Sequence, residues 1–286
     1  MKTFLDCIPC FIRQALDAGR MASDDPAVHE QMLRDVLRLT SEMRLSDSPP
    51  RMGQQIHRRL RDLTGNTDPY AAVKKQFNRM ALKLLPELQA RAAASKDPFT
   101  TAVRLAITGN IIDFGPTGTI TEQDALDAVE KALVEPFYGD IHGFRAALEE
   151  ADTILYLADN AGEIVFDRVL IEYLPLDRIT LAVRGVPVIN DATAEDAEVA
   201  GLTELVEVID NGSDAPGTLL EDCSAVFRER FYSADLIIAK GQGNFETLSD
   251  VPAPIFFLFK AKCPVISGHA GVPLQAQVLV RGNNAT

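Results

Sequence analysis

The chain has 286 residues, 47% of them hydrophobic, which is enough to bury a large core in one domain or in two smaller ones. Its formal net charge of -13, from 41 acidic and 28 basic residues, excludes nucleic acid and anionic membrane as expected partners. We expect a cytoplasmic protein, because no apolar run approaches the roughly 18 residues of a membrane span and no signal-peptide layout is present. Four cysteines are too few for a disulfide scaffold, and nothing in the sequence indicates an oligomeric state.

Residues 1–95 have the apolar spacing of helices and predict a helical subdomain. Asp25 with Pro26 and Asp68 with Pro69 are helix-start signals, because aspartate caps exposed N–H groups and proline tolerates the first helical position. Pro86 interrupts the last long helix of this part and is expected to kink it.

A cysteine pair, Cys7 and Cys10, lies at the very start of this helical part. A thioredoxin-like redox motif follows a strand, whereas only six residues precede Cys7. A zinc site would need two more ligands, and neither the other cysteines nor the four histidines have a paired spacing. Two interpretations therefore stand: a helix start with half-buried thiols, or a second metal or redox site.

The segment 109–115 carries Asn110 and Asp113 between two glycines. As structure, it is a helix stop. As function, it would bring two polar side chains from the helical part toward a cleft between the two parts of the chain.

Residues 96–286 predict an α/β domain, a three-layer α/β/α sandwich with a mainly parallel sheet. Two helical stretches, 121–134 and 140–150, come first. Short apolar runs rich in Ile, Leu and Val then alternate with helix-compatible segments, as in parallel sheets covered on both faces. Residues 263–266 and 277–280 are expected to add short strands at the end, either parallel or antiparallel to the others. The five main runs are 153–158, 178–183, 205–209, 235–239 and 255–259.

Polar residues follow these runs, at the edge of the sheet where parallel strands end and ligands bind. Asp159 and Asn160 come after the first run, and Asp191 comes shortly after the second. Carboxylate and amide oxygens favour hard divalent cations such as Mg²⁺ or Mn²⁺. Each turn alone is also explained by helix capping. The coincidence of several such turns on one edge favours a metal site at this edge.

Basic residues and glycines at the same edge would bind an anion facing that cation. Arg184 follows the second run, and Lys240, Gly241 and Asn244 follow the fourth. This Lys-Gly-Gln-Gly-Asn sequence is neither a Walker loop nor a dinucleotide fingerprint, and its glycines also suit a plain tight turn. A cation with basic groups around it is the equipment for phosphoryl transfer, so we expect a small phosphorylated substrate.

Together these motifs resemble the damage-control phosphatase family, formerly a domain of unknown function numbered eighty-nine, and in particular its shorter archaeal and bacterial branch. The likeness covers nearly the whole chain, and five motifs occur in the expected order. The family's larger eukaryotic members lack the cysteine pair, so they say nothing of its role. The segments that carry the resemblance are 7–10, 109–113, 159–163, 184–193 and 240–246.

The resemblance implies a metal-dependent phosphatase that hydrolyses small phosphate monoesters, such as sugar phosphates and damaged or surplus phosphorylated metabolites. It implies one divalent cation, Mg²⁺, Mn²⁺, Co²⁺ or Ni²⁺, held by an Asp-Asn pair and a later Asp. Carried over by position, the ligands are Asp159, Asn160 and Asp191. The resemblance also implies that Lys240 lies beside the phosphate with Asn244 nearby. Asn110 and Asp113 match the segment that faces the substrate in the family.

We expect Asp159, Lys240 and Glu163 to be the catalytic residues. The nucleophile is either a water held by the cation or a carboxylate such as Asp159. The Asp-x-Asp signature of aspartyl phosphatases is absent after the first strand, which weakens the covalent route. Glu163 is either a base that orients the water or only a first-turn helix carboxylate.

Two rival functions remain open on the sequence. One is a non-catalytic metabolite- or metal-binding protein whose cysteine pair binds zinc or senses redox state. It would bind a ligand tightly without turnover. The other is a transferase acting on a phosphorylated substrate, which would release no free phosphate without an acceptor.

Overall fold

A computed structural model describes residues 1–109 and 121–282 of the chain. Asn110 and Asp113, predicted to face the substrate, therefore lie outside the described residues. The seven strands in the described ranges are β1 (Phe137–Gly139), β2 (Ile154–Leu157), β3 (Ile179–Val183), β4 (Glu207–Asp210), β5 (Leu236–Lys240), β6 (Ile255–Lys260) and β7 (Gln277–Arg281).

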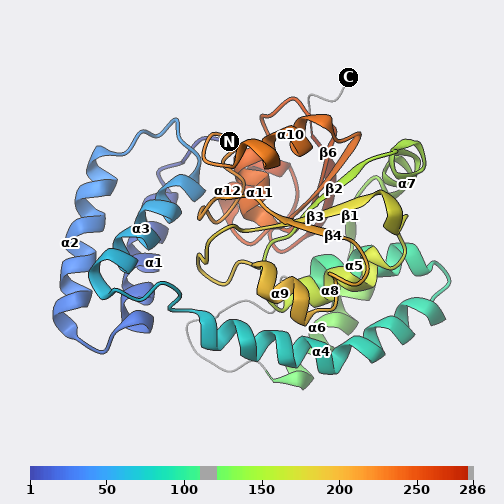
Figure 1. The fold of residues 1–286 in the computed structure, drawn as a ribbon, viewed down its shortest axis with the longest axis horizontal. Helices are drawn as coiled ribbons and strands as arrows, with labels where there is room; N and C mark the ends of the chain where they lie inside the picture. The colour runs from blue at the N-terminus through green and yellow to red at the C-terminus, as the bar shows by residue number, and fades with distance from the viewer. Residues whose placement is uncertain (110–120, 283–286) are drawn as a thin grey trace.

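These strands form one sheet with the order β1-β7-β6-β5-β2-β3-β4 (Figure 1). The pair β6–β7 is antiparallel, and the other five neighbouring pairs are parallel. The five predicted apolar runs became β2 to β6, so their carboxyl ends share one edge of the sheet.

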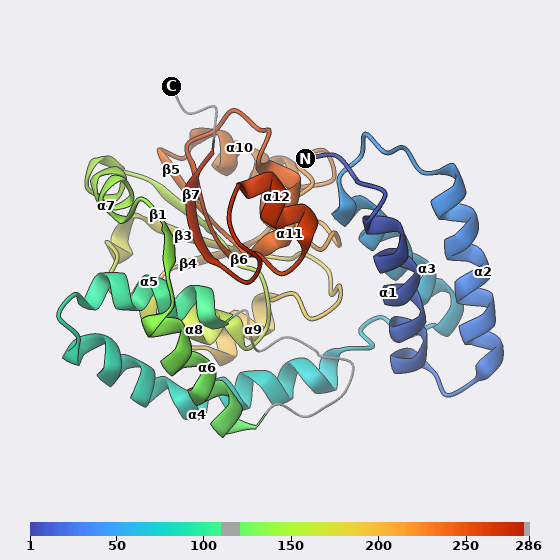
Figure 2. The same cartoon turned by 180° about the vertical axis from the view of Figure 1, so that it is seen from behind.

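Twelve α-helices lie in the described ranges. Helices cover both faces of the sheet (Figures 1 and 2). This arrangement confirms the predicted α/β/α sandwich. The helices are α1 (Cys7–Ala22), α2 (Pro26–Glu42), α3 (Pro49–Thr64), α4 (Ala71–Ala94), α5 (Pro98–Thr108), α6 (Glu122–Val134), α7 (Ile141–Glu150), α8 (Glu163–Ile171), α9 (Ala194–Val199), α10 (Ala225–Ser233), α11 (Gly241–Leu248) and α12 (Pro264–Ala270).

The strands are continuous apolar runs because both sides of the sheet are buried. In β2, Ile154 and Tyr156 pack into the core shared with α4, α5 and α8, whereas Leu155 and Leu157 pack into the core shared with α10 and α11. Alternate side chains of a strand point to opposite faces, so a strand covered on both faces needs apolar residues at every position.

Helices α1 to α3 form a group beside the sandwich and have a small core of their own (Figure 1). Helix α4, which follows them, packs against α5 and α8 and shares the core of the sandwich. It runs through Pro86 as one continuous helix. The division of the chain at residue 95 stays a prediction. No helix among the described residues has the length and apolar character that crossing a membrane requires.

One predicted strand is wrong, and one strand was missed. Residues 263–266 begin helix α12, because Pro264 occupies its first position, where the absent N–H costs nothing. The segment 277–280 is the expected strand, β7, and it runs antiparallel to β6. The missed strand is β1, which has three residues, lies at the edge of the sheet and is not fully buried, so it has no apolar run.

Candidate active site

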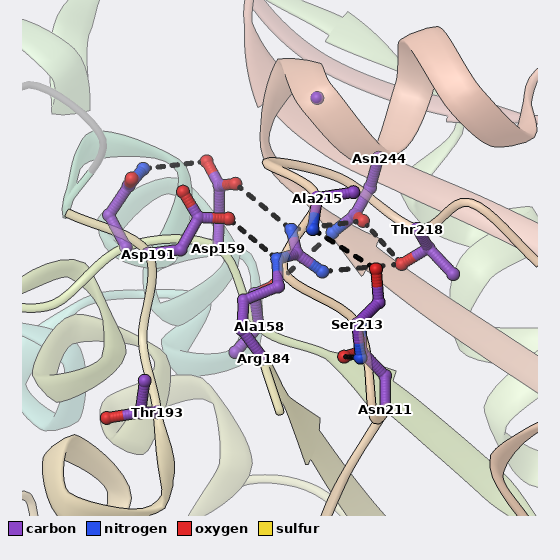
Figure 3. A network of polar contacts seen from close by, with 12 residues as sticks. Ala158, Asp159, Arg184, Asp191, Thr193, Asn211, Ser213, Ala215, Thr218 and Asn244 are labelled. Carbon is purple, nitrogen blue, oxygen red and sulfur yellow. Dashed lines mark hydrogen bonds and ion pairs between the residues drawn. The ribbon is translucent and has the colours of Figure 1, made fainter. Parts of the chain in front are cut away.

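Asp159, Asn160 and Asp191, the predicted metal ligands, come together at the carboxyl edge of the sheet. Asp159 and Asn160 follow β2, and Asp191 lies in the loop after β3. An antiparallel bridge joins Asn160 to Asp191, and the N–H of Ala192 donates to the carbonyl of Asp159 at 2.8 Å. Figure 3 shows the two aspartates side by side. Backbone pairing of two loops therefore fixes the spacing of these residues.

Crowding of carboxylates gives this edge an affinity for positive charge. Burial raises the pKa of Asp159 well above its usual range, and the neighbouring charges of Glu163 and Asp191 raise it further. Arg184 and Lys262 act in the opposite direction. A divalent cation among these carboxylates would stabilise their charged forms.

The donor set fits a hard cation, but it does not consist of acidic side chains alone. Asn160 donates its amide N–H groups to Asp159 at 2.7 Å and to Glu163 at 3.0 Å, which leaves its carbonyl oxygen for a cation. In residues 1–109 and 121–282, no three His, Cys, Asp and Glu side chains surround one point closely enough to hold a metal. A site here would use two carboxylates and one amide oxygen.

Arg184, predicted to bind substrate, is buried, and its guanidinium faces both aspartates (Figure 3). Its Nε donates to Asp191 Oδ2 at 2.6 Å, and its Nη2 lies 3.8 Å from Asp159 Oδ1. The remaining guanidinium N–H groups are directed to Thr218 and Asn244, each at 3.4 Å. In this conformation Arg184 orients the aspartates, and its contact with substrate stays a prediction.

Lys240, predicted to hold the phosphate, is fully buried beside Glu163, which is almost as enclosed. Its ammonium donates to Glu163 at 2.6 Å, to Asp167 at 2.5 Å and to the carbonyl of Ala106 at 2.9 Å. Burial alone would lower the pKa of Lys240, but the two carboxylates more than offset it and raise the pKa. Since all three donors are used, contact with a phosphoryl group would require the loss of one of these bonds. That contact stays a prediction.

Asp167 is a member of the network that the sequence prediction missed. Burial raises its pKa to about 6, the charge of Glu163 adds to this, and Lys240 and the Tyr156 hydroxyl, 2.9 Å away, oppose it. The available signal was its position four residues after Glu163 in α8, which places both carboxylates on one face of the helix.

Gly241 and Asn244 shape the edge from the first turn of α11. Gly241 has a φ of +77°, and a Cβ there would lie 1.9 Å from Asp159 Oδ2, so only glycine lets the backbone approach this carboxylate. The Asn244 side chain donates to the carbonyls of Lys240 at 2.7 Å and Ala158 at 3.3 Å. Asn244 thus ties the ends of β2 and β5 together, and direct binding of substrate by Gly241 or Asn244 stays a prediction.

Lys262 is a further cation at this edge that was not among the predicted site residues. It follows β6, and its backbone N–H donates to the side chain of Gln242 at 3.3 Å. Its charge lowers the pKa of Asp159. It is half-buried, unlike Lys240 and Arg184, whose side chains are enclosed. The sequence places it after a strand, but only the fold shows that this strand neighbours β5.

Comparisons with known proteins cover almost the entire chain. Residues 3–278 match the family model of the damage-control phosphatase ARMT1-like domain. The chain is 37% identical to a damage-control phosphatase of Pyrococcus horikoshii, with 98% of each chain covered. It is 34% identical to a damage-control phosphatase of Archaeoglobus fulgidus, with 95% of this chain and 96% of the relative covered. The crystal structure of a DUF89 family protein from P. horikoshii superposes with a TM-score of 0.90 at 36% identity, covering 99% and 100% of the two chains.

Proposed function

The chain belongs to the damage-control phosphatase ARMT1-like family, and from this premise we propose that it hydrolyses small phosphate monoesters with one divalent cation. The substrates would be sugar phosphates or damaged and surplus phosphorylated metabolites, and the cation Mg²⁺, Mn²⁺, Co²⁺ or Ni²⁺. The observation that carries the proposal is the meeting of Asp159, Asn160 and Asp191 at a buried edge where carboxylates crowd together.

Asp159, Asn160 and Asp191 would hold the cation, whose chemistry is to polarise the phosphoryl group and to neutralise charge that builds up on its oxygens. Arg184 keeps both aspartates in position through its bond to Asp191 and its charge beside Asp159. Because the ligands are fixed by backbone pairing and by a buried guanidinium, the site is organised before the substrate arrives.

Glu163 is the proposed base that accepts a proton from the attacking water. One of its oxygens accepts from Lys240 and the other accepts from Asn160, so two hydrogen bonds fix the orientation of the carboxylate. Lys240 would act mainly by holding Glu163 in place. In this assignment Lys240 is a positioning residue, and Glu163 is the residue that takes part in the chemistry.

Water is a better candidate for the nucleophile than Asp159. Asp159 Oδ2 accepts from Asn160 at 2.7 Å and lies against the backbone of Gly241, and Asp159 Oδ1 faces Arg184. These contacts hold the carboxylate in place as a ligand of the cation, so we assign the attack to water. Lys262 and the N–H groups of the first turn of α11 would bind the phosphoryl oxygens.

Release of inorganic phosphate from an aryl phosphate and a panel of sugar and coenzyme-precursor phosphates tests the proposal. The assay is run with each of the four cations and with chelator. We expect cation-dependent hydrolysis that falls at least about a hundredfold, or about 3 kcal/mol in barrier, in Asp159→Ala. Asp152→Ala is the matched control and should keep full activity. Asp152 is exposed and precedes β2, the strand that Asp159 follows. Equal rates in the two variants would refute the assignment.

A further inference from the structure

Three of the four cysteines, the neighbouring Cys7 and Cys10 and the distant Cys263, line one cavity of about 840 Å³. Cys7 is the first residue of α1, Cys10 follows one turn later, and Cys263 immediately precedes α12 (Figure 2). The fourth, Cys223, is buried in the core of the sheet. The fold therefore brings three thiols to one cavity and keeps the fourth apart from it, so Cys223 can serve as a control in experiments on the other three.

The thiols of this cavity differ in access. Cys10 is exposed, whereas Cys7 and Cys263 are half-buried. Burial raises the pKa of the Cys7 thiol. Cys10, the more accessible thiol, is the one that an incoming reagent meets first. Because the thiolate is the reacting form and a raised pKa makes it less abundant, Cys7 is placed to react second.

The spacing of Cys7 and Cys10 suits a disulfide without movement of the backbone. Residues three apart in an α-helix have Cα atoms about 5 Å apart. Disulfides join residues whose Cα atoms are roughly 4.4–6.8 Å apart. The Cys10 thiol donates to the carbonyl of Asp6 at 3.8 Å, so its sulfur points back over the turn that begins with Cys7.

A metal site is the alternative, since three thiols and the ring of His269 line the same cavity. In the described ranges, however, no three such side chains surround one point closely enough to bind a metal ion. The walls also include apolar side chains, among them Phe4, Phe11 and Val265. Open space of this kind next to an exposed thiol suits a small organic molecule better than a bare ion.

We propose that Cys7 and Cys10 form a reversible dithiol–disulfide site that reacts with small organic disulfides entering this cavity. The Cys10 thiolate attacks one sulfur of the small disulfide, breaks its S–S bond and releases one thiolate. Cys7, once deprotonated, attacks the Cys10 sulfur of the mixed disulfide and releases the second thiolate. The two cysteines lose two electrons and two protons, and the small disulfide gains them as two thiols.

The test uses the full-length protein equilibrated with mixtures of reduced and oxidised glutathione. Remaining thiols are then blocked with a maleimide, and the peptides are mapped by mass spectrometry. We expect a Cys7–Cys10 disulfide that forms and disappears as the glutathione ratio changes. Cys7→Ser should instead accumulate glutathione on Cys10, because the second attack lacks its nucleophile.

Two matched variants complete the test. Cys223→Ala and Cys263→Ala should both keep the Cys7–Cys10 exchange, since neither residue takes part in it. The proposal is overturned if Cys7 and Cys10 stay reduced at every glutathione ratio or if Cys7 pairs with Cys263. It is also overturned if one zinc ion bound per chain protects both thiols from the maleimide.

Discussion

The two edges of the sheet carry the same kinds of charged residue but place them in different surroundings. At the carboxyl edge, the Lys240–Glu163 pair is 2.6 Å long and its side chains are 0% and 1% exposed. At the amino edge, the Arg230–Glu207 pair is 3.0 Å long and its side chains are 48% and 49% exposed. Exposed pairs contribute little because water screens them, whereas buried charges depend strongly on their partners.

A cavity borders the amino edge as well, so a cavity alone does not identify the site. The cavity at the amino edge, about 480 Å³, is lined by Arg178, Glu207 and Arg230 among others. Charges there are paired at the surface. The carboxyl edge differs because it encloses several carboxylates, among them Glu163 and Asp167, next to the two buried cations Lys240 and Arg184.

The largest expected effect is on stability, from Lys240→Met. Removal of the ammonium leaves Glu163 and Asp167 buried without their cation, which should lower the free energy of unfolding by about 3–5 kcal/mol. The measurement is urea unfolding followed by circular dichroism. Arg230→Met, the matched change at the amino edge, should cost no more than about 1 kcal/mol. Similar losses in both variants would abolish the distinction between the edges.

A smaller effect, on catalysis, is expected from Arg184→Lys. A single ammonium cannot reach Asp191 and face Asp159 together as the guanidinium does. We expect kcat/KM to fall roughly thirtyfold, or about 2 kcal/mol, with a higher cation concentration needed for half-maximal rate. Arg230→Lys serves as the control and should match the wild type. An unchanged cation requirement in Arg184→Lys would show that Arg184 does not position the ligands.

The smallest effect is a pH dependence from Glu246, a carboxyl of α11. Burial raises its pKa to about 7, although a bond from Gln242 and the charge of the chain's amino group oppose the shift. The folded chain thus keeps the proton to higher pH than the unfolded chain does. Below the ordinary pKa of a glutamate, the proton contributes its full stabilisation of the folded chain. That stabilisation is lost as the pH rises through about 7.

Glu246 is only half-buried, so solvent screens much of the penalty on its charged form. Glu246→Gln should therefore be more stable than the wild type by about 1 kcal/mol at pH ~8 and equal to it at pH ~4. Urea unfolding at both pH values measures the difference. A constant difference between the variants at the two pH values would show that Glu246 does not titrate in the folded state.

The fold could be predicted from the sequence wherever both faces of a strand are buried. The runs that became β2 to β6 are continuous and apolar, so length and composition identify them. The segment 263–266 differs from the prediction because its apolar residues suit a strand as well as a short helix, and Pro264 fits the first position of a helix. The three-residue β1 pairs with β7 through its backbone, which its side chains do not indicate.

The meeting of the candidate metal ligands at one edge of the sheet could be predicted from the sequence, but the electrostatics around them could not. Asp159 and Asp191 follow strands, and the parallel sheet brings them together. The bonds of Lys240 could not be foreseen, because its partner Asp167 lies inside a helix that is almost entirely buried. Which residue touches substrate and which one holds its neighbour depends on depth, and depth is a property of the folded chain.

The most direct measurement is the rate of phosphate release as a function of Mn²⁺ concentration in the wild type and in Asn160→Ala. Asn160 bridges to Asp191, and its amide oxygen is one of the three proposed ligands. We predict saturation by Mn²⁺ in the wild type and at least a tenfold higher half-saturating concentration in Asn160→Ala, or about 1.4 kcal/mol of cation binding. Identical curves, or equal rates with chelator present, would contradict a cation site formed by Asp159, Asn160 and Asp191.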